Sequence, residues 1–174
     1  MSSERPLVGE PLGLDLLNTV WRNRGATQDL LTDVPGARAF LDEAGMADQA
    51  TEQTRTALIT AREAIRAHVA DPADAAALND VLAWGRTWPV VGPDGPGTEV
   101  ELEHVYQRAG WLAAVNYVDL LNADPTRVRA CAHPDCVLHF YDTSPKRSRR
   151  WCSMAGCGNR AKAARHYAKA RTTE

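Results

Sequence analysis

The cysteines of this chain constrain its fold more than any other feature, because all four fall within 27 of its 174 residues. They form two pairs, Cys131 with Cys136 and Cys152 with Cys157. Each pair encloses four residues, and fifteen residues separate the pairs. Two close pairs joined by such a linker are typical of a tetrahedral Zn²⁺ site, because each pair can chelate from one turn. Four thiolates leave no open coordination position, so we expect one structural zinc ion.

Other roles for the cysteines are less consistent with the sequence. Buried small hydrophobic residues would not be expected to occur in evenly spaced pairs. Disulfides are rare in reducing compartments, and the chain shows neither a secretory signal nor a membrane span, so we expect a cytoplasmic protein. His133 and His139 could replace a cysteine ligand, but their positions favour roles beside the metal or on the surface.

The residues around the cysteines predict a small finger. Residues 137–142 alternate as a strand does, residues 143–148 are typical of a turn, and residues 149–151 can return beside the strand. Residues 160–171 are rich in helix formers. A knuckle, a hairpin and a terminal helix describe a treble-clef or zinc-ribbon-like finger. A segment of about 45 residues cannot build an adequate apolar core alone, so zinc binding would supply folding free energy.

The N-terminal part of the chain predicts a mostly helical domain with short strands, which gives an α+β fold overall. Ala57, Leu58, Ala61 and Ile65 recur at helical spacing. Asp124-Pro125 ends the last helix, so we expect one domain at 1–126 and the finger at 127–174. Strand or hairpin structure is expected at 7–14 and 87–103, and helices at 14–24 with Asp15 as N-cap, 34–44, 51–70 with Thr51 as N-cap, 72–85 and 104–123.

Charge divides the chain in the same place. Residues 1–126 contain nine Arg, no Lys and nineteen Asp or Glu, a formal charge of −10. Residues 127–174 contain eleven Lys or Arg and three acidic residues, a formal charge of +8. This asymmetry predicts a polyanion-binding element attached to an acidic body. Alternatively, the two parts attract each other and the basic face is partly covered.

The basic residues of the finger are the candidates for nucleic-acid contact. Cations on the turn, the return strand and the terminal helix can neutralise phosphates, which supplies most non-specific affinity. An alternative is that they only keep a small finger in solution, and another is that RNA is bound instead of DNA. The expected contact residues are Lys146, Arg147, Arg149, Arg150, Asn159, Arg160, Lys162, Arg165 and Lys169.

The run "WCSMAGCGNRAKAARHYAKAR", preceded by "CAHPDCVLHFYDTSPKRSRR", resembles the CGNR-type zinc finger, whose name spells Cys157, Gly158, Asn159 and Arg160. The likeness covers residues 129–171. Near the N-terminus "LDLLNTV" resembles the Leu-Asp-x-x-Asn-Thr signature of the ABATE domain, which precedes the finger in that family and is named a stress-induced transcription regulator. The resemblance implies a bacterial transcription regulator whose finger binds double-stranded DNA. It also implies that the four cysteines are the zinc ligands.

We therefore expect a DNA-binding regulator in which residues 1–126 sense a signal or assemble subunits. A homodimer is expected because one finger reads few base pairs. A small-molecule site would need convergent polar groups, and the candidates to line it are Asp15, Asn18, Thr19 and Arg22, with Trp84 and Trp111.

Two other classes of protein remain as alternatives. One is a small enzyme or ligand-binding protein with a structural finger. Its strongest acid/base candidates are Glu101, Glu103 and His104, whereas His68 stands alone, and no metalloprotease, phosphate-loop or Ser-His-Asp motif is present. The other is an adaptor whose basic finger contacts an acidic protein.

Overall fold

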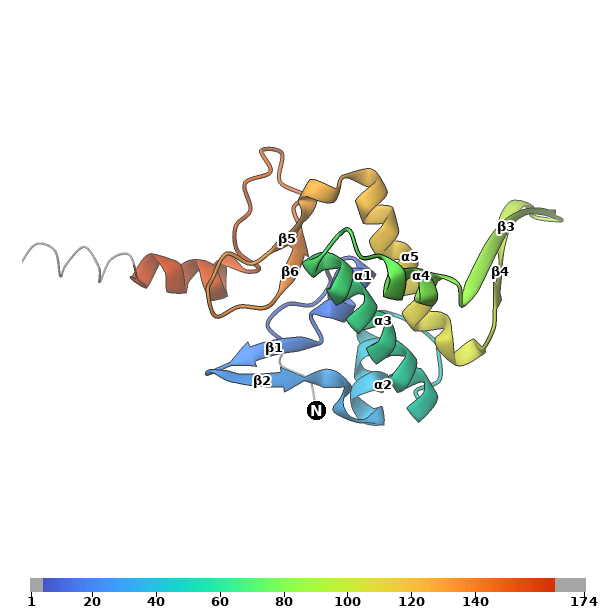
Figure 1. Ribbon diagram of the computed structural model, residues 1–174, viewed down its shortest axis with the longest axis horizontal. Helices are drawn as coiled ribbons and strands as arrows, with labels where there is room; N and C mark the ends of the chain where they lie inside the picture. The colour runs from blue at the N-terminus through green and yellow to red at the C-terminus, as the bar shows by residue number, and fades with distance from the viewer. Residues whose placement is uncertain (1–4, 165–174) are drawn as a thin grey trace, which may run out of the picture.

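The computed structural model describes residues 5–164, in which a helical body lies against the C-terminal finger (Figure 1). The helices are α1 (Leu12–Leu17), α2 (Val34–Glu43), α3 (Glu52–Ala70), α4 (Ala76–Leu82) and α5 (Arg108–Ala123). The strands of residues 5–164 form three two-stranded antiparallel sheets. These pair β1 (Val20–Asn23) with β2 (Ala26–Asp29), β3 (Gly85–Gly92) with β4 (Gly95–Leu102), and β5 (Val128–Ala130) with β6 (His139–Tyr141). This confirms the α+β class, with a mostly helical N-terminal part and a C-terminal finger.

The core of the body forms between α1, α3 and α5. The Thr51 hydroxyl accepts from the backbone N–H of Thr54 at 3.1 Å and caps α3, which places Leu58 and Ile65 on the buried face. Gly110 allows α5 to approach closely, because a Cβ there would lie 3.0 Å from the carbonyl oxygen of Ala57. The expected helices at 34–44, 51–70 and 104–123 and the hairpin at 87–103 are confirmed, with a 3₁₀ turn (Val105–Gln107) preceding α5.

Residues 7–24 fold differently from the sequence prediction. Residues 7–9 form no strand, and α1 begins at Leu12 after Pro11, whose fixed φ suits a helix start. Asp15 is therefore an interior helical residue and not an N-cap. The chain leaves the helix at Asn18 and returns as the β1–β2 hairpin, an element that the sequence analysis missed.

Two further predictions were wrong in their extent. Pro72 lies in a turn and α4 begins only at Ala76, because the carboxylates of Asp71 and Asp74 accept the backbone N–H groups of Ala73 and Ala76 and hold the intervening segment. In the finger, β6 pairs with β5 and residues 149–151 form no strand.

The finger is fixed to the body by the side chain of Asn18. Its Nδ2 donates to the carbonyl of His139 at 2.9 Å, and its Oδ1 accepts from the N–H of His139 at 2.9 Å. Asn18 therefore pairs with β6 as a neighbouring strand would, and its side chain is fully buried. Glu10 makes a second connection, accepting from the N–H of Tyr141 at 3.0 Å and from Arg149 at 2.8 Å. Together these contacts fix the orientation of the finger.

We expect Asn18→Ala to lower the free energy of unfolding by about 2–4 kcal/mol, because it removes a buried amide and leaves the partly buried N–H and C=O of His139 without that partner. Urea unfolding of the zinc-loaded protein measures this change. Asn79→Ala, on an exposed position of α4, is the matched control and should stay within about 0.5 kcal/mol of wild type. Equal stability of the two variants would contradict a structural role for the Asn18 amide.

Candidate metal centre and basic surface

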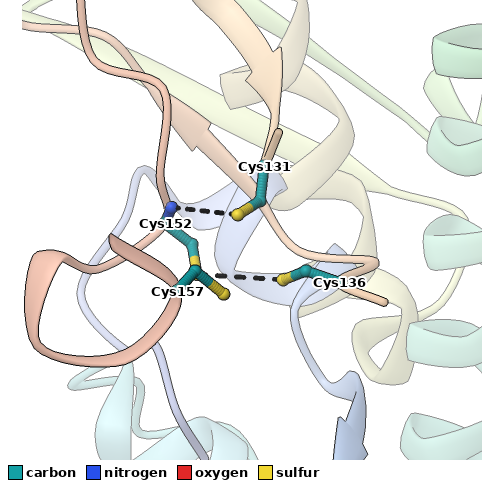
Figure 2. Close-up of side chains that lie close together, drawn as sticks. All are labelled: Cys131, Cys136, Cys152 and Cys157. Atoms are coloured by element: carbon teal, nitrogen blue, oxygen red, sulfur yellow. Dashed lines mark hydrogen bonds between the residues drawn. The ribbon is translucent and has the colours of Figure 1, made fainter. Parts of the chain in front are cut away.

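The four cysteine side chains converge on one point of the finger. Their Sγ atoms all lie within 4.8 Å of one another, with Cys136 and Cys152 at 3.8 Å and Cys152 and Cys157 at 3.5 Å (Figure 2). Zinc–sulfur bonds of about 2.3 Å place tetrahedral ligand atoms roughly 3.8 Å apart. The spacing of the sulfurs therefore fits a single zinc ion.

Backbone hydrogen bonds around the ligands hold this geometry. The N–H of Cys131 donates to the carbonyl of Leu138 at 2.9 Å, and that of Cys136 closes a turn onto the carbonyl of His133 at 2.9 Å. The N–H of Cys152 points at the Cys131 sulfur from 3.3 Å. Cys157 lies in a π-helical turn (Met154–Gly158) that Ser153 caps, and a helical segment follows at residues 159–164. The two pairs thus lie in separate turns from which they could chelate one ion.

The electrostatics of the cluster favour a dication. Hydrogen bonding from the Cys152 thiol lowers the pKa of Cys136 to about 5. That same hydrogen bond, burial and the nearby Cys136 charge raise the pKa of Cys152, and burial above all raises the pKa of Cys157 to about 11. A zinc ion bound by the four sulfurs would allow all of them to ionise. The four cysteines could hold one zinc ion, whose role with four protein ligands is structural.

The two histidines of the finger lie outside the cysteine cluster. The Nδ1 of His133 accepts from the N–H of Asp135 at 3.2 Å, within the first turn. Burial lowers the pKa of His139, whose backbone pairs with Asn18. Within residues 5–164, the metal-binding cluster contains cysteines alone.

A buried carboxylate, Asp142, holds the loop between the cysteine pairs. It accepts from the N–H groups of Ser144 at 2.9 Å and Arg149 at 3.0 Å, from the Ser144 hydroxyl at 2.6 Å, and from Arg129 at 3.2 Å. The hydrogen bonds from Ser144 are the main reason that the pKa of Asp142 falls to about 2. This explains why residues 149–151 do not return as a strand: the loop closes on Asp142 instead.

The predicted nucleic-acid contacts divide into two groups. Arg147 pairs with Asp124 of the body at 2.8 Å. Arg149 pairs with Glu10 of the body and stacks on Phe140 of the finger, so both guanidinium groups already have partners. The other described cations are exposed and form no ion pair with a carboxylate in residues 5–164: Lys146, Arg150, Arg160 and Lys162. Arg150 stacks on Trp151, and Arg160 donates to the Cys157 sulfur at 3.0 Å.

Asn159, Arg165 and Lys169 complete the predicted set. The exposed amide of Asn159 donates to the carbonyl of Ala155 at 3.3 Å. Arg165 and Lys169 lie outside the described residues. The described exposed cations come from the loop that follows β6 and from the beginning of the terminal helical segment.

The residues predicted to line a small-molecule site do not form one cavity. Asp15 binds Arg5 at 3.3 Å, and burial, opposed by Arg5, raises its pKa. Asn18 contacts the finger, and the Thr19 hydroxyl donates to Leu16 at 2.7 Å and accepts from Arg62 at 3.0 Å. Arg22 is exposed on β1.

Hollows suitable for a small molecule occur instead between α3 and the 3₁₀ turn before α5. One has a volume of about 290 Å³ and includes Trp84, Tyr106 and Gln53 in its walls. A neighbouring hollow of about 620 Å³ also includes Tyr106 and Gln53. Of the residues predicted to line a small-molecule site, Trp84 lies in the smaller hollow. The other residues of its walls come from α3 and the 3₁₀ turn, which are distant from Trp84 in the sequence, so no local pattern indicated them.

The candidate acid/base residues have other contacts. Glu101 pairs with Arg86 across the β3–β4 hairpin, and His104 stacks on Tyr106 with ring centres 5.0 Å apart. His68 shares a 2.9 Å hydrogen bond with the Tyr117 hydroxyl.

Comparison with known families gives two matches. Residues 127–170 match the model described as CGNR zinc finger. Residues 10–124 match the ABATE model, described as "Putative stress-induced transcription regulator". Both descriptions are of a regulator or a zinc finger and not of an enzyme. No curated protein matches the chain. In residues 5–164 no helix has the length and apolar character needed to cross a membrane.

We expect one zinc ion per chain, and loss of that ion in Cys152→Ser, because three thiolates bind zinc less well and leave an open position. Elemental analysis of protein purified without added metal measures the stoichiometry. Ser148→Ala, which changes an exposed serine of the intervening loop, should retain the zinc. A metal-free wild-type protein that keeps the folded finger would contradict this assignment.

We expect Asp142→Asn to lower the thermal midpoint of the zinc-loaded protein, because the amide cannot accept the same set of donors. The lowered pKa means that the carboxylate stabilises the fold fully at neutral pH and loses this effect as the pH falls from about 4 towards 2. Scanning calorimetry at pH 7 measures the difference, and Asp119→Asn on the exposed surface of α5 is the control. An unchanged midpoint would show that the loop does not depend on Asp142.

Proposed function

The chain belongs to the ABATE family and carries a CGNR zinc finger, and from this premise we propose that it is a transcription regulator whose finger binds double-stranded DNA. In this proposal residues 127–174 contact DNA, and residues 1–126 sense a signal or assemble subunits. The regulator would act in the cytoplasm, where the zinc thiolates stay reduced.

The observation that carries the proposal is that some cations of the finger pair with carboxylates of the body, whereas others are exposed and have no such partner in residues 5–164. Arg147 and Arg149 face acidic residues of the body, so the attraction between the two halves uses these side chains. Lys146, Arg150 and Lys162 are exposed and have no carboxylate partner in residues 5–164. A set of uncompensated cations on a small rigid module suits the regularly spaced phosphates of a duplex.

The zinc ion would have a supporting role in this function. Held by the four cysteines, it would fix the loop that carries Arg150 and the turn that precedes Arg160 and Lys162. These residues would therefore meet DNA with little loss of conformational entropy. Arg160 also donates to a ligand sulfur, so its guanidinium is oriented by the metal site itself.

A signal would bind in the hollows between α3 and the 3₁₀ turn before α5. Trp84 and Tyr106 offer aromatic surface, and Gln53 and Thr56 offer hydrogen-bonding groups. Thr56→Arg would fill the smaller hollow without touching the finger. Loss of an effector's influence on DNA affinity in this variant, with basal affinity unchanged, would support the assignment, and a retained response would contradict it.

The adaptor alternative makes a different prediction from the regulator. In the adaptor alternative the basic finger contacts an acidic protein, and binding that is competed by unrelated protein but not by DNA would favour it. A homodimer belongs to the regulator proposal, because two fingers would read a longer site than one. Light scattering of the zinc-loaded protein with and without DNA measures the assembly.

We expect wild-type protein to bind duplex DNA with an affinity that falls steeply with salt. The variant Lys146→Gln/Arg150→Gln/Lys162→Gln should bind at least roughly tenfold more weakly, and its slope of log K against log[salt] should be smaller by up to about 2.7. Fluorescence anisotropy over a salt series measures both quantities.

The matched control removes three exposed arginines of the body, as Arg38→Gln/Arg86→Gln/Arg108→Gln. It changes net charge equally and should leave the salt slope as in wild type. A zinc-loaded wild-type protein that binds no DNA at low salt would overturn the proposed function.

A further inference from the structure

The β1–β2 hairpin of the body is fixed beside the finger. Asn18, which pairs with His139, lies two residues before the start of β1, and Trp21 of β1 packs against the apolar cluster of the finger. The other strand ends at Asp29, whose two carboxylate oxygens bind Arg62 of α3 at 2.6 and 2.9 Å. In Figure 1 the hairpin and the terminal helical segment extend towards the same side of the molecule. Both ends of the hairpin are thus anchored, and its tip is directed towards the side on which the terminal helical segment lies.

A hollow between the hairpin and the finger brings two arginines together. Its volume is about 170 Å³, and its walls include Arg22 of β1 and Arg160 of the finger. The candidate metal ligands Cys136, Cys152 and Cys157 also line it, so the hollow adjoins the metal site. Asp135 also lines it and supplies one opposing charge. Arg22 is exposed and forms no ion pair with a carboxylate in residues 5–164. The basic surface of the finger therefore continues onto the body.

The tip of the hairpin carries a third arginine under conformational strain. Arg24 and Gly25 form its two-residue turn, with φ of +49° and +85°. Turns of this kind favour Asn-Gly, because glycine has no Cβ and Asn accepts positive φ more readily than other residues. An exposed arginine at such a position lowers the local stability of the turn but places a positive charge at its tip.

The charge around the hairpin also distinguishes it from the rest of the body. Residues 20–28 contain Arg22 and Arg24 and no acidic residue, although residues 1–126 as a whole have a formal charge of −10. Asp29, at the base, is already neutralised by Arg62. The hairpin is thus a locally basic projection of an acidic domain, on the side where the finger's exposed cations begin.

We propose that the β1–β2 hairpin is a second DNA-contacting element, in which Arg22 and Arg24 bind phosphates of the duplex that the finger engages. This inference rests on the proposed function of the finger. Guanidinium groups suit phosphate oxygens because they can donate two parallel hydrogen bonds. Contacts to phosphates position the protein without reading sequence, so the hairpin would set the orientation of the finger on the duplex.

The test compares zinc-loaded wild type with Arg22→Gln/Arg24→Asn. Asn accepts the left-handed conformation at position 24 more readily than Arg, so the variant should keep or raise the thermal midpoint. Its affinity for duplex DNA should fall about tenfold, and the salt slope should decrease by up to about 1.8. The control Arg38→Gln/Arg86→Gln removes the same charge from α2 and β3.

The outcomes separate this inference from the function on which it rests. Weaker binding with a smaller slope in the hairpin variant, and not in the control, would support it. Wild-type affinity and slope in the hairpin variant would overturn the inference while leaving the function of the finger intact. If wild type itself binds no duplex DNA, the proposed function fails and the inference fails with it. A loss for single-stranded RNA but not for duplex DNA would overturn the choice of partner.

Discussion

The paired hydrogen bonds between the Asn18 amide and the peptide group of His139 connect the two halves of this protein, and the remaining structure depends on that connection. The Asn18 side chain hydrogen-bonds to the backbone N–H and C=O of His139 in β6. The body therefore supplies the hydrogen-bond partner that these backbone groups of the finger need. The position of the β1–β2 hairpin follows from it, because β1 begins two residues after Asn18. The Asn-Thr pair of the ABATE-like signature thus has an architectural role: Thr19 joins α1 to Arg62 of α3.

Charge has two distinct uses in the molecule. Attraction between the acidic body and the basic finger is real, but it is concentrated in a few contacts, such as Glu10 with Arg149 and Asp124 with Arg147. The Glu10–Arg149 pair is partly shielded from water, whereas the Arg147 side chain of the second pair is exposed. The exposed cations lie elsewhere, and the hairpin extends them with Arg22 and Arg24. Attraction between the two parts therefore involves some cations of the finger, and the expectation of a polyanion-binding element concerns the others and stays a prediction.

The metal site and the basic surface are physically linked. Cys152 and Cys157 bracket the turn from which the terminal helical segment starts, and Arg160 donates to the Cys157 sulfur. Asp142 organises the loop that carries Lys146 and Arg150 by accepting backbone donors from both of its ends. A zinc ion held by the cysteines would thus act with Asp142 and the loop to support the cations, and its removal would be expected to release them together.

The sequence by itself determined the cysteine cluster that could hold zinc, the class of fold and the long helices, because cysteine spacing, capping residues and apolar periodicity are local signals. It did not determine the start of α1. The β1–β2 hairpin was missed because an Arg-Gly turn is a weak signal. The pairing of β6 was missed because β6 pairs with β5 and not with residues 149–151. Only the tertiary structure decided which polar side chains are engaged in contacts between the body and the finger. Asn18 and Glu10 meet partners 121 and 139 residues away, so no local pattern could show that Arg149 is engaged while Arg150 is exposed.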